Sequence, residues 1–324
     1  MIPQSKQAGA ALLSILLIVA TLSVAALMAT EAIARQTDLQ KLSARRTAAL
    51  WGARSAEAAA LAGAADLVAA SRLPAGSGDT GREQTLVLPV ESGQIILTLR
   101  ELPPCLNLNA LANSDETTRA PQAAAFAVLL EDIGVPRSDA AALAATLGDW
   151  IDADQIPQPG GGEDADYAST ATAQRTAGQP LRSRAELTPV PGYTPELIQA
   201  ISPFICAIPL TEGLRVNVNA LTAENALVLR AATRGALSAA DARRFIEARP
   251  ASGWTSVQDV AEFAQRRQGY AQAFAEVPLA IRGEYFTGEG SIDLDAGRWR
   301  FRFILHAGAD GAPRITWRSF GDAG

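Results

Sequence analysis

The chain has 324 residues, of which 48% are hydrophobic and 19% charged, and its formal net charge is −6. This length and apolar content suffice for one or two packed cores, which argues against a mainly disordered chain. A surplus of negative charge opposes binding to a phosphate backbone, so we expect no nucleic-acid partner.

The N-terminus combines a short polar leader with a long apolar segment. The leader carries Lys6 and ends at Gly9, and residues 10–30 are uncharged and mostly apolar. A helix of about 20 residues spans about 30 Å, the thickness of the hydrocarbon core of a bilayer. The small-residue cleavage site precedes this segment instead of following it, so we expect cleavage between Gly9 and Ala10, which leaves the anchor in place. The alternative is an uncleaved signal anchor on an unrelated ectodomain.

A helix followed by strands is predicted next. Residues 10–70 contain no proline, so one helix is expected to continue beyond the membrane over 31–73 and to end at Pro74 and the glycines of 76–81. The region 84–104 predicts two strands, 84–90 and 94–102, joined by a short connection that contains Gly93. Four further strands, separated by Gly and Asp turns, are predicted in the C-terminal region, 279–324, and they cover 283–287, 291–295, 298–306 and 314–319.

Between the two β regions lies an Ala-rich helical block, residues 105–278. Helix starts are predicted at Ser114, Ser138, Ser183, Thr194, Thr222 and Ser238. The segment from Asn107 to Leu111 recurs from Asn217 to Leu221, which suggests two lobes of about 105–214 and 215–278. The predicted fold class is therefore α+β: a long N-terminal transmembrane helix, a small antiparallel sheet and a large α-helical insertion.

An acidic loop is the one segment whose residues suggest site chemistry. Proline and glycine interrupt it, so it can fold back on itself. Its carboxylates are Asp149, Asp152, Asp154, Glu163, Asp164 and Asp166. Hard oxygen donors without nearby His or Cys favour Ca²⁺ over zinc or copper. Ile156 and Pro157 exclude an EF-hand, and the absence of a following GK[ST] excludes a phosphate loop. The alternative is an exposed, solvated acidic turn without an ion.

Two other features favour structural roles. Residues 237–263 resemble a helix-hairpin-helix or SAM-like module, but its arginines are offset by acidic residues, which favours packing over DNA binding. His306 lies in an expected strand, and no Ser or Cys is accompanied by an evident His and acid. Nucleophilic catalysis is therefore not supported.

A family resemblance is carried by the leader, the acidic loop and the repeat. The leader, Lys6-Gln7-Ala8-Gly9 before Ala10-Ala11-Leu12-Leu13, resembles the class III signals of type IV pilins and type II secretion pseudopilins. Ser14 stands where the family usually has Glu, which is typical of the K-type minor pseudopilin. The segment Leu147 to Tyr167, both Asn-containing repeats and Gly253-Trp254 are also similar to that family. The resemblance covers nearly the whole chain.

The resemblance implies the pseudopilin fold, calcium in the acidic loop and a non-enzymatic function. That function is to cap the tip of a periplasmic pseudopilus and to initiate its assembly for protein export across the outer membrane. Expected partners are other minor pseudopilins in a tip complex, the major pseudopilin and prepilin peptidase, with the outer-membrane secretin or exported substrates as further candidates. Two alternatives from other classes are an anchored calcium-dependent binding protein outside a filament and a tethered hydrolase that uses the acidic loop.

Charge near the anchor gives conflicting indications of its orientation. Arg35, Lys41, Arg45 and Arg46 follow the anchor and would favour a cytoplasmic C-terminal side, whereas Lys6 favours the opposite. The resemblance agrees with Lys6, so we expect a single-pass protein of the bacterial inner membrane with its C-terminal domain in the periplasm. In that oxidising compartment we expect Cys105 and Cys206 to pair, the alternative being two buried free thiols.

Overall fold

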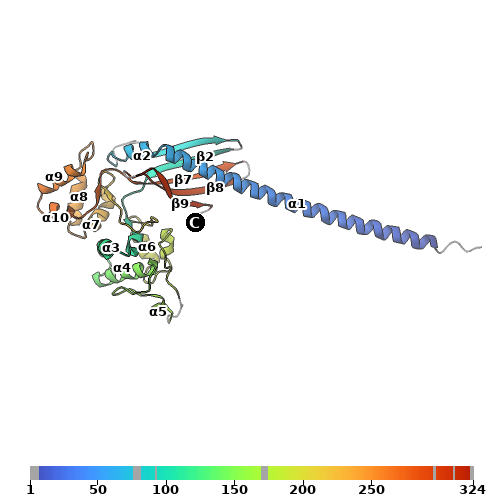
Figure 1. Ribbon diagram of the computed structural model, residues 1–324, viewed down its shortest axis with the longest axis horizontal. Coiled ribbons are helices and arrows are strands. Elements are labelled where there is room, and N and C mark those ends of the chain that lie inside the picture. Colours follow the sequence, from blue (N-terminus) through green and yellow to red (C-terminus); the bar gives the residue numbers. More distant parts are fainter. Residues whose placement is uncertain are drawn as a thin grey trace, which may run out of the picture.

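Figure 1 shows a computed structural model of the chain, which describes residues 7–75, 82–91, 93–168, 174–294, 297–308 and 311–321. The leader up to Lys6, the helix-terminating glycines of 76–81 and Ser92 of the predicted hairpin lie outside the described residues. Asp295, the last residue of a predicted strand, lies outside them as well.

The N-terminal helix α1 runs over Gln7–Ala62 and contains both residues of the expected cleavage site, Gly9 and Ala10. From Leu12 onward it is the helix of the described chain that is long and apolar enough to cross a membrane. Its large apolar side chains between Leu12 and Met28 are more than half exposed, because no described part of the chain covers them. The N-terminal half of α1 therefore presents an apolar surface that requires a lipid or protein environment.

The sequence predicted one helix that continues unbroken over residues 31–73, and this prediction was wrong in one respect. The helix α1 ends at Ala62, Gly63 forms a turn, and a separate helix α2 covers Ala64–Ala70. Glycine is about 1 kcal/mol less favourable than alanine inside a helix, which lowers the cost of a break at Gly63. Propensity alone does not decide the position, because Gly52 lies inside α1 without a break. Leu67 of α2 is buried, so the turn directs an apolar side chain into the core beside the sheet.

Five antiparallel strands form the sheet, in the order β1-β2-β7-β8-β9. Their bounds are Glu83–Val90, Gly93–Glu101, Tyr285–Leu294, Gly297–His306 and Arg314–Phe320. The sheet packs one face on α1, where small side chains, Ala49, Ala53, Ala56 and Ala60, allow close approach. The sheet side of this core is formed by Ile95, Leu97, Leu99, Phe286, Ile292, Phe301, Phe303 and Leu305.

The two strands expected over 283–287 and 291–295 are one continuous strand, β7, so the prediction of a turn between them was wrong. Gly288 and Gly290 are strand residues paired with Phe303 and Phe301 of β8. A Cβ atom at Gly288 would overlap the Phe303 ring. These glycines therefore make room for aromatic rings on the core face, a reason for glycine in a strand that differs from turn formation.

The first helical lobe inserts between β2 and β7. Its elements are β3 Leu106–Asn107, η1 Leu108–Ala112, α3 Glu116–Asp132, α4 Arg137–Ile151, α5 Asp164–Tyr167, η2 Arg184–Leu187, α6 Pro195–Ile201 and β4 Ile205–Cys206. Two predicted helix starts were displaced. Asp115, not Ser114, caps α3 by accepting from the backbone N–H of Thr117, and Pro136 precedes α4.

The second helical lobe follows and has its own aromatic core around Phe245 and Trp254. Its elements are β5 Val216–Asn217, η3 Ala223–Asn225, α7 Ala226–Ala232, α8 Ala239–Glu247, α9 Val257–Gln265, α10 Tyr270–Phe274 and β6 Leu279–Ala280. The sequence placed the helix caps Thr194, Thr222 and Ser238 correctly.

The repeated Asn-containing segments occupy equivalent places in the two lobes. Each begins with a short parallel pair, β3 with β4 and β5 with β6. Asn109 exchanges hydrogen bonds with the backbone of Leu181 and donates to Ile208 O. Asn219 exchanges the same bonds with Trp254 and donates to Ile281 O. In both lobes a buried asparagine thus ties the entering chain to the lobe interior and to the departing chain.

Figure 1 shows how these parts are arranged. α1 lies along one side of the sheet, and its apolar N-terminal half extends away from the rest of the molecule. The first lobe lies on the side of the sheet away from α1, and the second lobe (α7 to α10) lies at the end of the sheet most distant from the N-terminus.

Candidate metal centre in the first lobe

Three of the six loop carboxylates converge. Asp149 belongs to the last turn of α4, Asp152 follows the end of that helix, and Glu163 immediately precedes α5. Oxygen atoms of the three side chains lie within 4.8 Å of one another. Trp150 in α4 and Tyr167 in α5 form a T-shaped ring contact with centroids 6.0 Å apart, and this contact holds the two ends of the loop together.

The three carboxylates are buried, with exposed fractions of 0% for Asp149, 8% for Asp152 and 2% for Glu163. Asp149 accepts the backbone N–H of Gln158 at 3.0 and 3.2 Å. Among the described residues, Oδ1 of Asp152 and both carboxylate oxygens of Glu163 have no hydrogen-bond partner. A buried, unpartnered carboxylate is costly, so this cluster is incomplete without a proton or a cation.

Burial and mutual repulsion raise the pKa of these side chains. The pKa of Glu163 rises to about 7, first because burial disfavours the charged form and then because Asp152 and Asp149 repel it. The pKa of Asp152 rises to about 6 for the same two reasons, with repulsion from Asp154 and Asp149. Burial also raises the pKa of Asp149. The site thus strongly favours a compensating positive charge.

A glycine permits the close approach of the loop to Asp149. A Cβ atom at Gly161 would overlap Oδ2 of Asp149, and it would also press on the backbone of Ala145. The loop can therefore fold over the carboxylates only with glycine at this position.

The other three predicted ligands lie outside the three-carboxylate cluster and accept hydrogen bonds from the loop. Asp154 is exposed and accepts the backbone N–H of Ile156 at 2.9 Å. Asp164 accepts from the backbone and hydroxyl of Thr176, which lowers its pKa. Asp166 is exposed and accepts the backbone N–H of Glu163 at 2.9 Å. These side chains shape the loop that carries the buried trio.

The donor set fits a hard cation. All three side chains offer carboxylate oxygens, the chemistry that Ca²⁺ prefers, and three of those oxygens lack any other partner among the described residues. Asp149, Asp152 and Glu163 are therefore the residues that could hold a metal ion.

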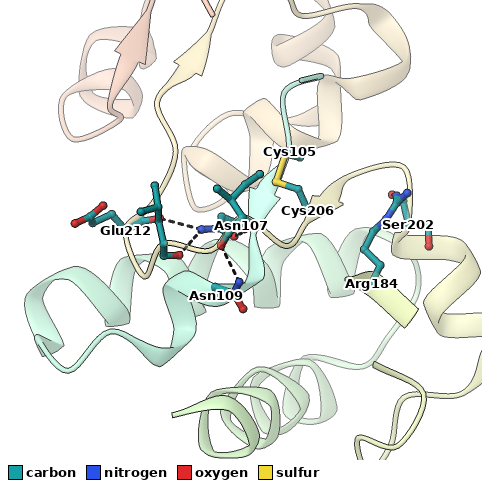
Figure 2. The surroundings of a disulfide bond; sticks show 9 residues. Cys105, Asn107, Asn109, Arg184, Ser202, Cys206 and Glu212 are labelled. Carbon is teal, nitrogen blue, oxygen red and sulfur yellow. Dashed lines mark hydrogen bonds between the residues drawn. A yellow bond between two sulfur atoms is a disulfide. The ribbon is translucent and has the colours of Figure 1, made fainter. Parts of the chain in front are cut away.

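A disulfide lies at the base of the same lobe. Cys105 and Cys206 are joined by an S–S bond of 2.08 Å and are separated by 101 positions in the chain. Figure 2 shows the bond beside Asn107, which donates to Leu210 O at 2.8 Å and to Glu212 O at 3.2 Å. The covalent bond and the asparagine side chain thus fasten the two strands through which the chain enters and leaves the lobe.

The fold defines the class of protein. A long apolar N-terminal helix laid on a small antiparallel sheet, with a helical insertion, is the architecture of a pseudopilin. The chain superposes on a chain of the crystal structure of the GspK-GspI-GspJ complex from the enterotoxigenic Escherichia coli type 2 secretion system with a TM-score of 0.68. The alignment covers 88% of this chain and 99% of that chain, at 25% sequence identity.

Sequence comparison identifies the family. Two profiles of the family described as type II secretion system (T2SS), protein K match residues 104–210 and 216–281. The chain is 33% identical over 308 residues to type II secretion system protein K of Klebsiella pneumoniae, covering 93% of this chain and 92% of that protein. The protein of the same name from Pseudomonas aeruginosa is 26% identical over 325 residues, covering 98% and 94%.

The chain belongs to the type II secretion system protein K family and is a pseudopilin. It is therefore a structural, non-enzymatic component of a secretion system, which removes the tethered hydrolase from consideration. Its apolar N-terminal helix agrees with anchoring by a single membrane span.

Proposed function

We propose that this protein caps the tip of a periplasmic pseudopilus and initiates its assembly for protein export across the outer membrane. The observation that carries the proposal is the position of the second helical lobe, at the end of the sheet most distant from the membrane helix (Figure 1). A subunit stacked on that end would collide with the lobe, whereas subunits below can still pack along α1.

The residue at position 14 supports the same position in the filament. In the family, the usual glutamate is thought to pair with the N-terminal amine of a neighbouring subunit. Ser14 offers no carboxylate, so this chain cannot provide that ion pair to a subunit above it. At the tip of the filament no subunit lies above this chain, so the missing carboxylate has no consequence there.

The related complex suggests the neighbours. The solved structure that this chain resembles is a complex of GspK with GspI and GspJ. We infer that the chain joins the corresponding minor pseudopilins in a tip complex, below which the major pseudopilin follows.

The chain would be an inner-membrane protein with a periplasmic C-terminal domain. Prepilin peptidase would cleave its precursor after Gly9, so that Ala10 becomes the N-methylated N-terminal residue. Intact mass of membrane-extracted protein tests the cleavage, and a mass that retains residues 1–9 contradicts it.

Calcium binding by the first lobe is part of the proposal. Asp149, Asp152 and Glu163 would hold the ion, and the ion would supply the positive charge that these buried carboxylates lack. Its role would be structural, because it would join the end of α4 to the start of α5 across an irregular loop. An anchored calcium-binding protein outside a filament would use the same site, so the position of the chain in the filament decides between the two functions.

Copy number tests the tip position. If the chain caps the filament, sheared pseudopili should contain one copy each whatever their length, so its ratio to the major pseudopilin should fall in inverse proportion to filament length. Quantitative mass spectrometry of length-fractionated filaments measures this ratio. A ratio that stays constant with length would place the chain along the shaft and would reject the proposal.

A further inference from the structure

A second surface with binding chemistry lies on the face of the sheet opposite α1. Successive strand residues point to opposite faces. In β8, Phe301 and Phe303 are buried against α1, so Arg298, Arg300 and Arg302 point to the other face. The first lobe lies on that side of the sheet (Figure 1).

A groove forms where this face meets the first lobe. Its volume is about 380 Å³, and Arg100 and Arg302 of the sheet line one side while Arg182 and Arg184 of the lobe line the other. Figure 2 shows Arg184 beside Ser202, to whose carbonyl oxygen it donates a hydrogen bond. A neighbouring hollow of about 420 Å³ shares Arg302 and continues along β8 past Arg300 and Arg298. The two hollows together form one elongated surface, which we call the arginine groove.

Positive charge dominates the arginine groove. Its six arginines face two carboxylates. Glu289 pairs with both Arg100 and Arg302, at 3.3 and 3.1 Å. Asp293 pairs with Arg298 at 2.6 Å.

The remaining three guanidinium groups of the groove are uncompensated. Those of Arg182, Arg184 and Arg300 form no ion pair within the described part of the chain, and Glu186 accepts the backbone N–H of Arg182 and not its guanidinium group. The chain as a whole has a net charge of −6, so this surplus is a local feature and not a consequence of composition.

The end of the groove beside the disulfide is apolar. Ile304 of β8 and Trp317 of β9 are paired neighbours on the open face, and Ile208 of the lobe lies in the same lining. An occupant of the groove would therefore meet guanidinium groups along most of its length and an aromatic ring at one end.

We propose that the arginine groove docks an acidic, extended segment of another polypeptide. Guanidinium forks bind carboxylates in bidentate geometry, and the spacing of residues along a strand suits an occupant with repeated carboxylates. The apolar end suits one aliphatic side chain of the same segment. A lipid headgroup is disfavoured, because residues of the sheet and the first lobe line the groove, whereas the apolar half of α1 extends away from these parts (Figure 1). This inference does not depend on the tip position.

Fluorescence anisotropy of the full-length chain in neutral detergent tests the proposal. The probe is a fluorescein-labelled hexaglutamate peptide that ends in leucine, and the control probe replaces glutamate by glutamine. We expect the acidic peptide to bind with an affinity that falls as salt rises from 50 to 200 mM, and the glutamine peptide not to bind. Trp317→Ala should weaken the leucine-containing peptide more than hexaglutamate alone.

Charge reversals inside and outside the groove distinguish binding by the groove from attraction by the overall charge of the protein. Arg182→Glu with Arg300→Glu should lower the affinity at least tenfold. Arg137→Glu with Arg243→Glu makes the same change in net charge at exposed positions outside the groove and should leave the affinity within twofold. Thermal unfolding of both variants checks that they are folded. If the charge reversals unfold the chain, Arg182→Gln with Arg300→Gln replaces them in the binding measurement. Equal losses in both pairs overturn the proposal. So does binding to phosphatidylglycerol vesicles without binding to the peptide.

Discussion

Glu163 is the residue on which the candidate metal centre depends most. Both of its carboxylate oxygens are buried without a hydrogen-bond partner among the described residues, whereas Asp149 is satisfied in part by the backbone of Gln158. The sequence predicted six possible ligands, and the geometry brings three of them together. The sequence could not separate the two sets, because burial depends on how the loop folds over α4, and Pro157, Pro159 and the glycines of 160–162 leave that path open.

Replacing Glu163 by glutamine should abolish stabilisation by calcium. An ion that binds only the folded chain raises stability by mass action, about 2.7 kcal/mol at a ligand concentration of 100 times Kd. The thermal midpoint of the unchanged protein should therefore rise on adding Ca²⁺, and that of Glu163→Gln should not. Glu247→Gln, an identical change at an exposed position of α8, should keep the full response. If Asp154→Asn removes the response as completely as Glu163→Gln, the three-residue assignment is wrong.

The same carboxylates predict how stability depends on pH. In the calcium-free protein the pKa values of Glu163 and Asp152, about 7 and 6, lie above the ordinary values for unfolded chains. The folded state then binds more protons than the unfolded state, so their stabilising effect is complete at low pH and is lost as pH rises toward 7. The thermal midpoint of the calcium-free protein should therefore decrease as the pH is raised from 4.5 to 7.5. The increase in thermal midpoint caused by Ca²⁺ should become larger over the same range. A calcium effect that is larger at pH 5 than at pH 7.5 would contradict the site.

At the scale of elements, the sequence predicted the helix caps, which depend on neighbouring residues. It did not predict the features that depend on packing between distant segments. The caps of α6 and α8 were identified because Ser and Thr side chains satisfy the first free backbone N–H groups of a helix. Gly288 and Gly290 were interpreted as turn residues because their real reason, two phenylalanine rings from the next strand, is a contact between segments. Gly63, which follows the last residue of α1, was not singled out in the sequence, so the break between α1 and α2 was not predicted.

The disulfide should stabilise the first lobe as an element. It closes a loop of 101 positions, for which the chain-entropy model gives up to about 4.7 kcal/mol. Cys105→Ser with Cys206→Ser should lower the free energy of unfolding by up to this amount, chiefly by loosening the lobe whose entry and exit strands the bond joins. Thiol counting on the denatured, non-reduced protein should find no reactive thiol. Two reactive thiols would show that the bond does not form in the protein as made.

For the whole molecule, the order of parts was predictable from the sequence and their placement was not. The apolar segment, the sheet and the Ala-rich insertion follow from composition and periodicity. The repeated asparagines suggested two lobes, and Asn109 and Asn219 indeed make equivalent buried hydrogen bonds. That the second lobe lies beyond the end of the sheet, and the first beside its open face, depends on long-range contacts such as that of Asn217 with Glu101.

The central claim is that this chain occupies one end of the pseudopilus, and gold labelling of assembled filaments tests it most directly. A short epitope tag placed after Gly324 keeps every described contact, and filaments sheared from cells are labelled and viewed by electron microscopy. The account predicts a single gold particle at one end of each filament and none along the shaft. Particles distributed along the shaft, or filaments that form normally without the chain, would contradict it.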